Sequence, residues 1–114
     1  MITYTLYKKK RYNNNYFEIC IYKEKVYIGN INFFLTFNEF FNIMEIRKLN
    51  LSDSYKEYSL QLLNNAEYIA NINYDIEKSV ISINKLSKDN IKFYKSNGYK
   101  TKNNYLYKYL KKIS

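Results

Sequence analysis

The segment Ser87–Lys100, SKDNIKFYKSNGYK, combines the signals of a short helix with the residue types that suggest a chemistry. Its first residue, a serine, is a good helix N-cap, and Ile91 and Tyr94 lie three residues apart, which places them on one helix face. Gly98 supplies the left-handed residue that commonly ends a helix. We therefore expect a short amphipathic helix here, followed by a strand that begins at Tyr99.

Four strands are predicted before the main helix, because apolar and polar residues alternate there. They span residues 1–7, 16–22, 26–35 and 41–51, and the second and third form an antiparallel hairpin. Lys8–Arg11 and the asparagines that follow are expected to form a solvated loop. In the fourth strand, strict alternation places Glu45 and Leu49 on the face opposite Met44 and Ile46.

The period changes from two to 3.6 between Ser54 and about Asn71, which predicts the main helix. Its apolar face is expected to carry Tyr58, Leu62, Ala66, Ile69 and Ala70, with Glu67 off that face. Ser54 and Glu57 have the spacing of a capping box, in which each side chain accepts a hydrogen bond from the other residue's amide. Residues 79–83 and 99–109 are predicted to form the last two strands.

The predicted order is β-β-β-β-α-β-α-β, which belongs to the α+β class. A mixed, mostly antiparallel sheet with two packed helices is the economical way to bury these faces. The length of 114 residues suits one domain, residues 1–114, and neither a repeat nor a Pro- or Gly-rich linker divides it.

Composition excludes several classes of site. The chain has no His and one Cys, Cys20, so a His-based triad, a His or Cys-cluster metal site and an internal disulfide are excluded, and no metal site is predicted. No apolar run could span a bilayer and no signal peptide is recognisable, so we expect a soluble, cytoplasmic protein without a membrane partner. The 15 Tyr and the many Asn and Lys are typical of an AT-rich genome, such as that of a phage or low-GC bacterium.

The formal net charge of +9 is concentrated at the two ends of the chain. Residues 1–15 carry four basic groups and no acid, residues 88–114 carry eight Lys and one Asp, and the residues between them are slightly acidic. Such ends favour acidic macromolecules, which could be nucleic acid, a nucleoprotein or an acidic protein surface. Lys-rich ends are equally compatible with a solvated surface.

An aromatic-Tyr, three residues and a Gly-aromatic pair, here Phe93-Tyr94 and Gly98-Tyr99, resemble the C-terminal motif of the GNAT superfamily, the GCN5-related N-acetyltransferases. Three segments in the same order strengthen the resemblance. These are Lys25–Gly29 at the entry to a strand, Glu45–Leu51 in the fourth strand, and Leu62-Leu63 in the main helix. The resemblance covers roughly residues 16–110 and implies a minimal GNAT fold that lacks the family's N-terminal helical pair.

The resemblance also implies roles for individual residues. Tyr94 matches the usual proton donor to the departing coenzyme A thiolate, and Glu45 on the fourth strand would be the base that deprotonates an amine. The implied cofactor is acetyl-CoA. The residues that would bind it are Leu49, Leu51, Lys56, Tyr58 and Ser59.

The expected coenzyme-binding loop departs from the family pattern. The family's first loop glycine falls on Glu57, which places a negative charge where phosphates should lie, and the expected capping box with Ser54 would occupy the backbone amides. Lys56 could supply a compensating charge and Ser59 is small enough to permit a close approach.

Three hypotheses follow. The first is an acyl-CoA-dependent N-acyltransferase with an eroded pyrophosphate loop and an unassigned acceptor. The second is a catalytically inactive GNAT-fold protein, phage or mobile-element encoded, that binds an acidic macromolecule through its basic ends. The third is a structural or small interaction protein that shares the topology by chance. A homodimer through an exposed sheet edge is compatible with each of them.

Overall fold

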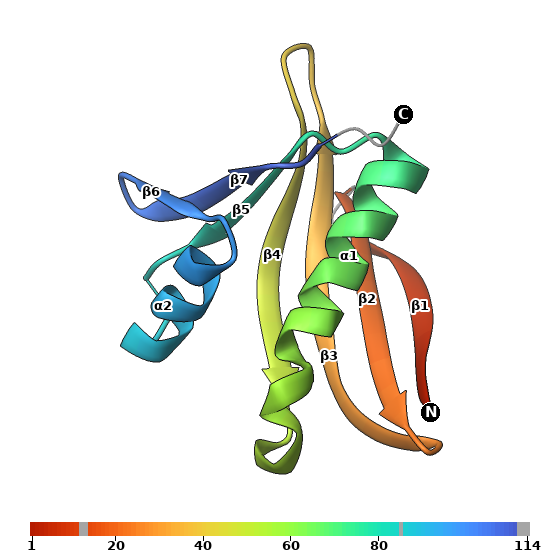
Figure 1. The fold of residues 1–114 in the computed structure, drawn as a ribbon. Helices are drawn as coiled ribbons and strands as arrows, with labels where there is room; N and C mark the ends of the chain where they lie inside the picture. The colour runs from red at the N-terminus through yellow and green to blue at the C-terminus, as the bar shows by residue number, and fades with distance from the viewer. Residues whose placement is uncertain (12–13, 85, 112–114) are drawn as a thin grey trace.

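The computed structural model describes residues 1–11, 14–84 and 86–111. Figure 1 shows a single twisted sheet flanked by helices. In chain order the elements are β1 (Ile2–Arg11), β2 (Asn14–Lys23), β3 (Val26–Phe37), β4 (Asn42–Leu51), the 3-10 helix η1 (Asp53–Tyr58), α1 (Ser59–Tyr74), β5 (Lys78–Ser82), α2 (Lys88–Ser96), β6 (Lys100–Lys102) and β7 (Tyr105–Tyr109).

The seven strands form one sheet in the order β1-β2-β3-β4-β5-β7-β6. Every pairing in the described residues is antiparallel except that of β4 with β5, which is parallel and is connected through η1 and α1. The predicted α+β class and the mixed sheet with two packed helices are confirmed. β1 and β6 form opposite edges of the sheet, so the two basic segments of the chain lie far apart across it.

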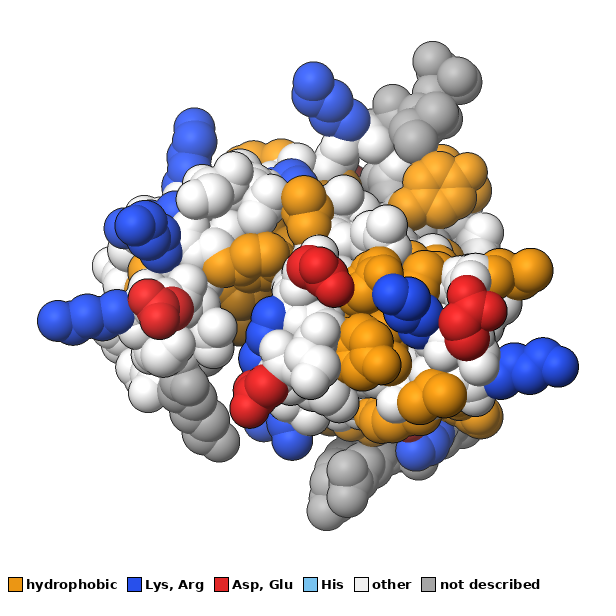
Figure 2. Space-filling view, turned by 60° about the horizontal axis from the view of Figure 1, so that its bottom comes forward, with side chains coloured by type: hydrophobic (Ala, Val, Ile, Leu, Met, Phe, Trp, Pro, Cys, Tyr) orange, Lys and Arg blue, Asp and Glu red, His pale blue; other side chains and the backbone are white. Residues whose placement is uncertain are grey.

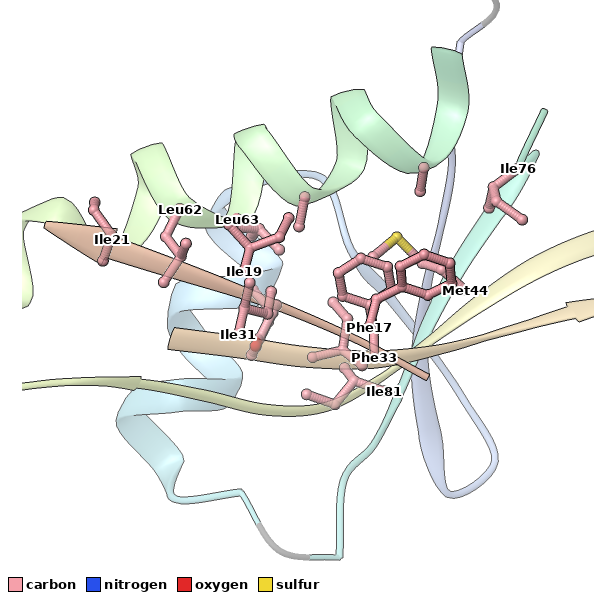
Figure 3. Close-up of a cluster of buried hydrophobic side chains, with 14 of the residues drawn as sticks. Phe17, Ile19, Ile21, Ile31, Phe33, Met44, Leu62, Leu63, Ile76 and Ile81 are labelled. Carbon is pink, nitrogen blue, oxygen red and sulfur yellow. The ribbon is translucent and has the colours of Figure 1, made fainter. Parts of the chain in front are cut away.

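The core lies between α1 and one face of the sheet (Figure 3). Leu62, Leu63, Ala66 and Ala70 of α1 are buried there because their spacing of three or four residues puts them on one helix face. The strands contribute alternate residues, and the rings of Phe17 and Phe33 stack with centroids 5.6 Å apart. The buried side of the sheet is therefore fixed by the period-two pattern of β2 and β3.

β1 is longer than predicted. Lys8–Arg11 continue the strand instead of forming a loop, and Lys8 lies opposite Phe17 of β2. The prediction of a solvated loop was wrong because β1 is an edge strand, where charged side chains reach solvent without leaving the strand conformation.

The last predicted strand, residues 99–109, is two strands. Asn103 adopts a left-handed conformation with φ 54°, and the turn that it makes with Asn104 joins β6 to β7 as an antiparallel hairpin. Asn tolerates this conformation better than most residues, and a pair of asparagines is a turn signal. The prediction of one continuous strand was therefore wrong.

The main helix begins later than predicted. Residues 53–58 form η1, α1 begins at Ser59, and its left-handed end lies at Asp75 with φ 55°. The expected capping box was wrong. Among the described residues no hydrogen bond joins the Ser54 side chain to Glu57, and instead the Ser59 hydroxyl donates to the Lys56 carbonyl oxygen at 2.7 Å.

The signals around α2 are confirmed. The Ser87 hydroxyl accepts a hydrogen bond from the Asn90 amide at 3.1 Å, and Gly98 has φ 95°. A Cβ at position 98 would also approach the side chain of Lys108 to 3.3 Å. Neither α1 nor α2, the helices of the described residues, is long and apolar enough to span a bilayer.

Candidate functional site

β4 and β5 separate along their length and leave a cleft between them. Their parallel pairing covers only Ile43–Ile46 against Lys78–Ile81, while β4 continues to Leu51. Figure 1 shows the two strands side by side at one end and diverging toward the other. Beyond Ile46, the edge of β4 that faces β5 is not paired with another strand of the described residues. The backbone donors and acceptors along this edge therefore face the cleft.

A β-bulge in β4 lies where the two strands begin to separate. Asn32 of β3 pairs with Lys48 and Phe33 pairs with Ile46, so Arg47 is the extra residue. Bulges bend and twist a strand and occur frequently beside active sites. The bulge also changes the faces of β4, because Leu51 is now buried on the same side as Met44 and Ile46, against the strict alternation predicted.

The cleft has a volume of about 780 Å³. Its walls are the second half of β4, the start of α1, the end of β5 and one side of α2. The lining residues are Glu45–Leu51, Lys56, Ser59, Ile81, Ser82, Asn84, Leu86, Asn90, Phe93 and Tyr94. Figure 2, turned toward the end where the strands diverge, shows hydrophobic side chains within the recess left of centre. The cleft thus has an apolar floor and a polar rim.

Tyr94 of α2 is the buried phenol of this cleft. Its side chain is 2% exposed and packs edge-to-face against Tyr99, with ring centroids 5.2 Å apart. Its hydroxyl is buried and has no hydrogen-bond partner among the described residues. Burial, together with the charge of Glu67, raises the pKa of Tyr94 well above its usual range, because both disfavour the phenolate. Tyr94 therefore stays a neutral phenol to a higher pH than an ordinary tyrosine.

A buried polar network lies behind Tyr94. The Tyr99 hydroxyl donates to the Glu67 carboxylate at 2.7 Å, and Lys108 Nζ donates to the other carboxylate oxygen at 2.9 Å. The Ser79 hydroxyl lies 2.7 Å from the Tyr99 oxygen. Because Tyr99 has a single hydroxyl proton and gives it to Glu67, Ser79 must donate to Tyr99.

The sequence analysis placed Glu67 off the apolar helix face, and this was wrong. Glu67 is 8% exposed and shares the buried side of α1. The signal was present in the spacing, since Glu67 follows Leu63 by four residues and precedes Ala70 by three. Its charge argued for solvent, but partners from β7 and from the segment before β6 satisfy the carboxylate.

Glu45 and Arg47 form an ion pair at the mouth of the cleft. Their charged atoms are 2.8 Å apart, both side chains are about half exposed, and the Arg47 guanidinium lies 5.6 Å from the ring of Phe34. This pair holds the Glu45 carboxylate near the site where β4 bulges. Arg47 was not singled out from the sequence, because alternation alone does not reveal a bulge.

η1 and the start of α1 bring Lys56 and Ser59 to the cleft, but not Glu57 or Tyr58. The Lys23 ammonium lies 5.3 Å from the ring of Tyr58. The hydrogen bond with Tyr58 and, to a smaller extent, the charge of Glu57 raise the pKa of Lys23. Glu57 thus acts on a lysine of β2 and does not line the cleft.

The structure brings together six of the seven site residues predicted from the sequence. Tyr94, Glu45, Leu49, Leu51, Lys56 and Ser59 line the cleft. Tyr58 lies elsewhere, with its ring 6.4 Å from that of Tyr55. No group of three or more His, Cys, Asp or Glu side chains that could bind a metal occurs within residues 1–11, 14–84 and 86–111.

Comparison with solved structures identifies the fold. The structure matches the PaiA N-acetyltransferase of Thermoplasma acidophilum, in complex with coenzyme A, with a TM-score of 0.69 and 22% identity. The chain has the GNAT fold. The match covers 82% of this chain and 60% of the Thermoplasma protein, so the chain spans less than two thirds of that protein.

Other GNAT-fold structures match over more of their own length. A GNAT family acetyltransferase from Elizabethkingia anophelis, with acetyl-CoA bound, has a TM-score of 0.69 and 12% identity over 94% of this chain and 98% of its own. Tetrahymena GCN5 has a TM-score of 0.69 and 15% identity over 87% and 71%. No protein-family model and no curated protein matches the sequence. The GNAT fold is therefore recognised here through structure.

Proposed function

We propose that the chain is an acyl-CoA-dependent N-acyltransferase whose acyl donor lies in the cleft between β4 and β5. The observation that carries the proposal is the unpartnered, buried hydroxyl of Tyr94 in the wall of that cleft. A buried hydroxyl without a partner costs about 1–3 kcal/mol, and a ligand atom that accepts its hydrogen bond would recover this energy. GNAT-fold structures with coenzyme A or acetyl-CoA bound support the choice of ligand.

The residues of the cleft fit an acyl-CoA. The unpaired edge of β4 beyond Ile46 offers backbone hydrogen bonds to an extended, amide-containing chain. Lys56 of η1 supplies a positive charge, and Ser59, the small first residue of α1, permits a close approach of the phosphates. The expected capping box between Ser54 and Glu57 does not form, and Glu57 does not line the cleft.

The acyl-CoA would supply the reactive thioester and a thiolate leaving group. Tyr94, a neutral phenol whose buried hydroxyl has no partner among the described residues, is the proposed hydrogen-bond and proton donor in the wall of the cleft. Glu45, held beside Arg47 at the mouth, is the proposed proton acceptor for the attacking amine. We leave the acceptor amine unassigned in this proposal.

Calorimetric titration with acetyl-CoA tests the proposal. Asn90 is exposed on α2 and lines the cleft, so Asn90→Trp should fill it, whereas Ser96→Trp places the same ring at an exposed position of that helix outside the cleft. We expect one molecule of acetyl-CoA to bind to the wild type and to Ser96→Trp, and binding to be lost in Asn90→Trp.

Two results would overturn the acyltransferase proposal. The first is the absence of both heat and thermal stabilisation at millimolar acetyl-CoA, since a ligand that binds the folded state must raise its stability. The second is unchanged binding to Asn90→Trp, which would place the ligand outside the cleft. Either result would favour the alternative of a catalytically inactive GNAT-fold binding protein.

A further inference from the structure

The last three strands present a second surface on the face of the sheet opposite the core. Residues that lie directly opposite each other on neighbouring strands share a face, and Leu106 and Ile81 point into the core. Their neighbours point to the other side. This Tyr-Lys face consists of Lys78 of β5, Lys100 and Lys102 of β6, and Tyr105, Tyr107 and Tyr109 of β7.

The three tyrosines form a row along β7. The ring centroids of Tyr105 and Tyr107 are 6.5 Å apart, and those of Tyr107 and Tyr109 are 5.7 Å apart. Tyr109 is 58% exposed, and Tyr105 and Tyr107 are half-buried. Alternate residues of one strand therefore place three aromatic rings on the same face of the sheet.

Lysines flank this row on both sides. Lys100 lies opposite Tyr107 and Lys102 opposite Tyr105 on the edge strand β6. On the other side, the Lys78 ammonium lies 5.3–5.9 Å from the centroids of all three tyrosine rings. The positive charges are thus placed beside the rings and along both sides of the row.

No acid neutralises this surface. β5, β6 and β7 contain no Asp or Glu, and within residues 1–11, 14–84 and 86–111 no ion pair involves the three lysines. Glu45 of β4 lies on the same sheet face across Val80, but its carboxylate is paired with Arg47. Glu67 contacts Lys108 and Tyr99 on the opposite face of the sheet. The Tyr-Lys face is therefore positively charged and aromatic.

We propose that the Tyr-Lys face binds single-stranded nucleic acid. Aromatic side chains that stack bases, combined with cations that follow the phosphates, are the physical basis of sequence-tolerant single-strand binding. A duplex keeps its bases stacked inside and could use only the lysines. An acidic protein would likewise use the lysines and gain little from the ring row, so the rings decide in favour of a single strand.

This surface is independent of the proposed acyl-CoA site. None of its six residues lines the cleft between β4 and β5. The basic residues of β1 are not part of it either, because β1 and β6 lie at opposite edges of the sheet. Nucleic-acid binding is thus assigned to the C-terminal basic segment together with Lys78, and not to the N-terminal one.

Fluorescence anisotropy with a labelled oligothymidine tests the proposal. Tyr109→Leu should weaken binding about fivefold or more, as expected for the loss of one stacked base. Tyr68→Leu is the matched control, because Tyr68 on α1 is 56% exposed, as Tyr109 is at 58%, and lies outside the face. We expect Tyr68→Leu to bind like the wild type.

The charge arm of the experiment compares two double variants. Lys100→Gln with Lys102→Gln should lower the slope of log K against log salt concentration by about 1.4, the effect of two lost phosphate contacts on a single strand. Lys92→Gln with Lys95→Gln removes the same charge from exposed positions of α2 and should leave the slope nearly unchanged.

Three outcomes would overturn the proposal. The first is the absence of binding to the oligothymidine at low salt. The second is equal affinity for a duplex of the same length with no effect of Tyr109→Leu. The third is competition by polyglutamate at equal charge concentration together with an unaffected Tyr109→Leu, which would identify a surface for acidic proteins. Circular dichroism of each variant separates these outcomes from misfolding.

Discussion

The Tyr99 hydroxyl donates a 2.7 Å hydrogen bond to the buried carboxylate of Glu67 and thereby ties α1 to the segment that follows α2. The ring of Tyr99 also packs edge-to-face against Tyr94, the phenol of the cleft. The helix that closes the cleft is thus held to the helix of the core through one buried polar contact. The stability of the fold and the placement of Tyr94 depend on the same residues.

Tyr99→Phe should lower the free energy of unfolding by about 1–3 kcal/mol, because it keeps the ring but leaves a carboxylate oxygen of Glu67 without its donor. Urea denaturation measures the loss. Tyr68→Phe removes an exposed hydroxyl from α1 and should change stability by less than about 0.5 kcal/mol. Equal stabilities of the two variants would show that the buried contact contributes nothing.

The fold should lose stability in alkaline solution. Burial, with the charge of Glu67, raises the pKa of both Tyr94 and Tyr99 above the ordinary value of 10.0. Above that pH the folded chain holds protons that the unfolded chain has released. The stabilising contribution is therefore complete below about pH 10 and is lost as the pH rises further, by up to about 1.4 kcal/mol per pH unit for each tyrosine.

Urea denaturation across this pH range gives the measurement for the alkaline loss. Tyr94→Phe should reduce the loss of stability per pH unit by about half, because only one of the two tyrosines with a raised pKa then remains. Tyr105→Phe serves as the control, because Tyr105 is a half-buried tyrosine of the sheet face opposite the core. A decline that is equally steep in Tyr94→Phe would contradict the assignment.

Tyr94→Phe should weaken acetyl-CoA binding about tenfold, the effect of the one hydrogen bond that it removes. At saturating acetyl-CoA it should slow acyl transfer about 10²- to 10⁴-fold, the usual contribution of a positioned proton donor. The ring remains and fills the same volume, so the cleft keeps its shape. Calorimetry gives the affinity, and release of free thiol in the presence of an amine acceptor gives the rate. An unchanged rate would remove Tyr94 from the chemistry.

Lys56 and Glu57 are adjacent in the chain, but only substitution of Lys56 should weaken acetyl-CoA binding. Lys56 lines the cleft, so Lys56→Gln should weaken acetyl-CoA binding about two- to fivefold, the effect of one exposed charge pair. Glu57 does not line the cleft, so Glu57→Gln should change the affinity by less than about twofold. If Glu57→Gln instead strengthened acetyl-CoA binding by more than about twofold, the Glu57 carboxylate would be shown to repel the phosphates.

Replacing Gly29 of β3 by a larger residue should destabilise the fold. A Cβ there would collide with the Asn50 carbonyl oxygen and approach the Leu51 Cα to 2.9 Å, both in the backbone of β4. We expect Gly29→Ala to cost about 1–3 kcal/mol of stability, as overpacking usually does. Thermal denaturation measures the cost. Because Leu51 ends the β4 wall of the cleft, weaker acetyl-CoA binding should accompany the loss of stability, and retention of both would contradict this packing.

The elements with a strong local signal were predicted correctly. The hairpins of β2 and β3 follow from alternation, and the ends of α2 follow from Ser87 and Gly98, whose roles depend only on adjacent residues. The position of Tyr94 on the buried face of α2 also follows from helical spacing. These local signals predicted the main elements of the fold and the helix that carries Tyr94.

The features that could not be predicted depend on pairing between distant segments. Arg47 is a bulge residue only because β3 pairs with β4 in a shifted register. The row of tyrosines meets Lys78 only because β7 is inserted between β5 and β6, which the order along the chain does not show. Lys8–Arg11 and Glu67 were misplaced for another reason, because their charge was weighed above their position in a strand or helix.

A crystal structure of the chain with acetyl-CoA is the most direct test of the central claim, that the cleft between β4 and β5 is an acyl-CoA site. We expect the thioester end between the two diverging strands, within hydrogen-bond distance of the Tyr94 hydroxyl, and the phosphates near Lys56 and Ser59. Acetyl-CoA bound elsewhere on the protein, or a cleft that stays empty at millimolar acetyl-CoA, would contradict the claim.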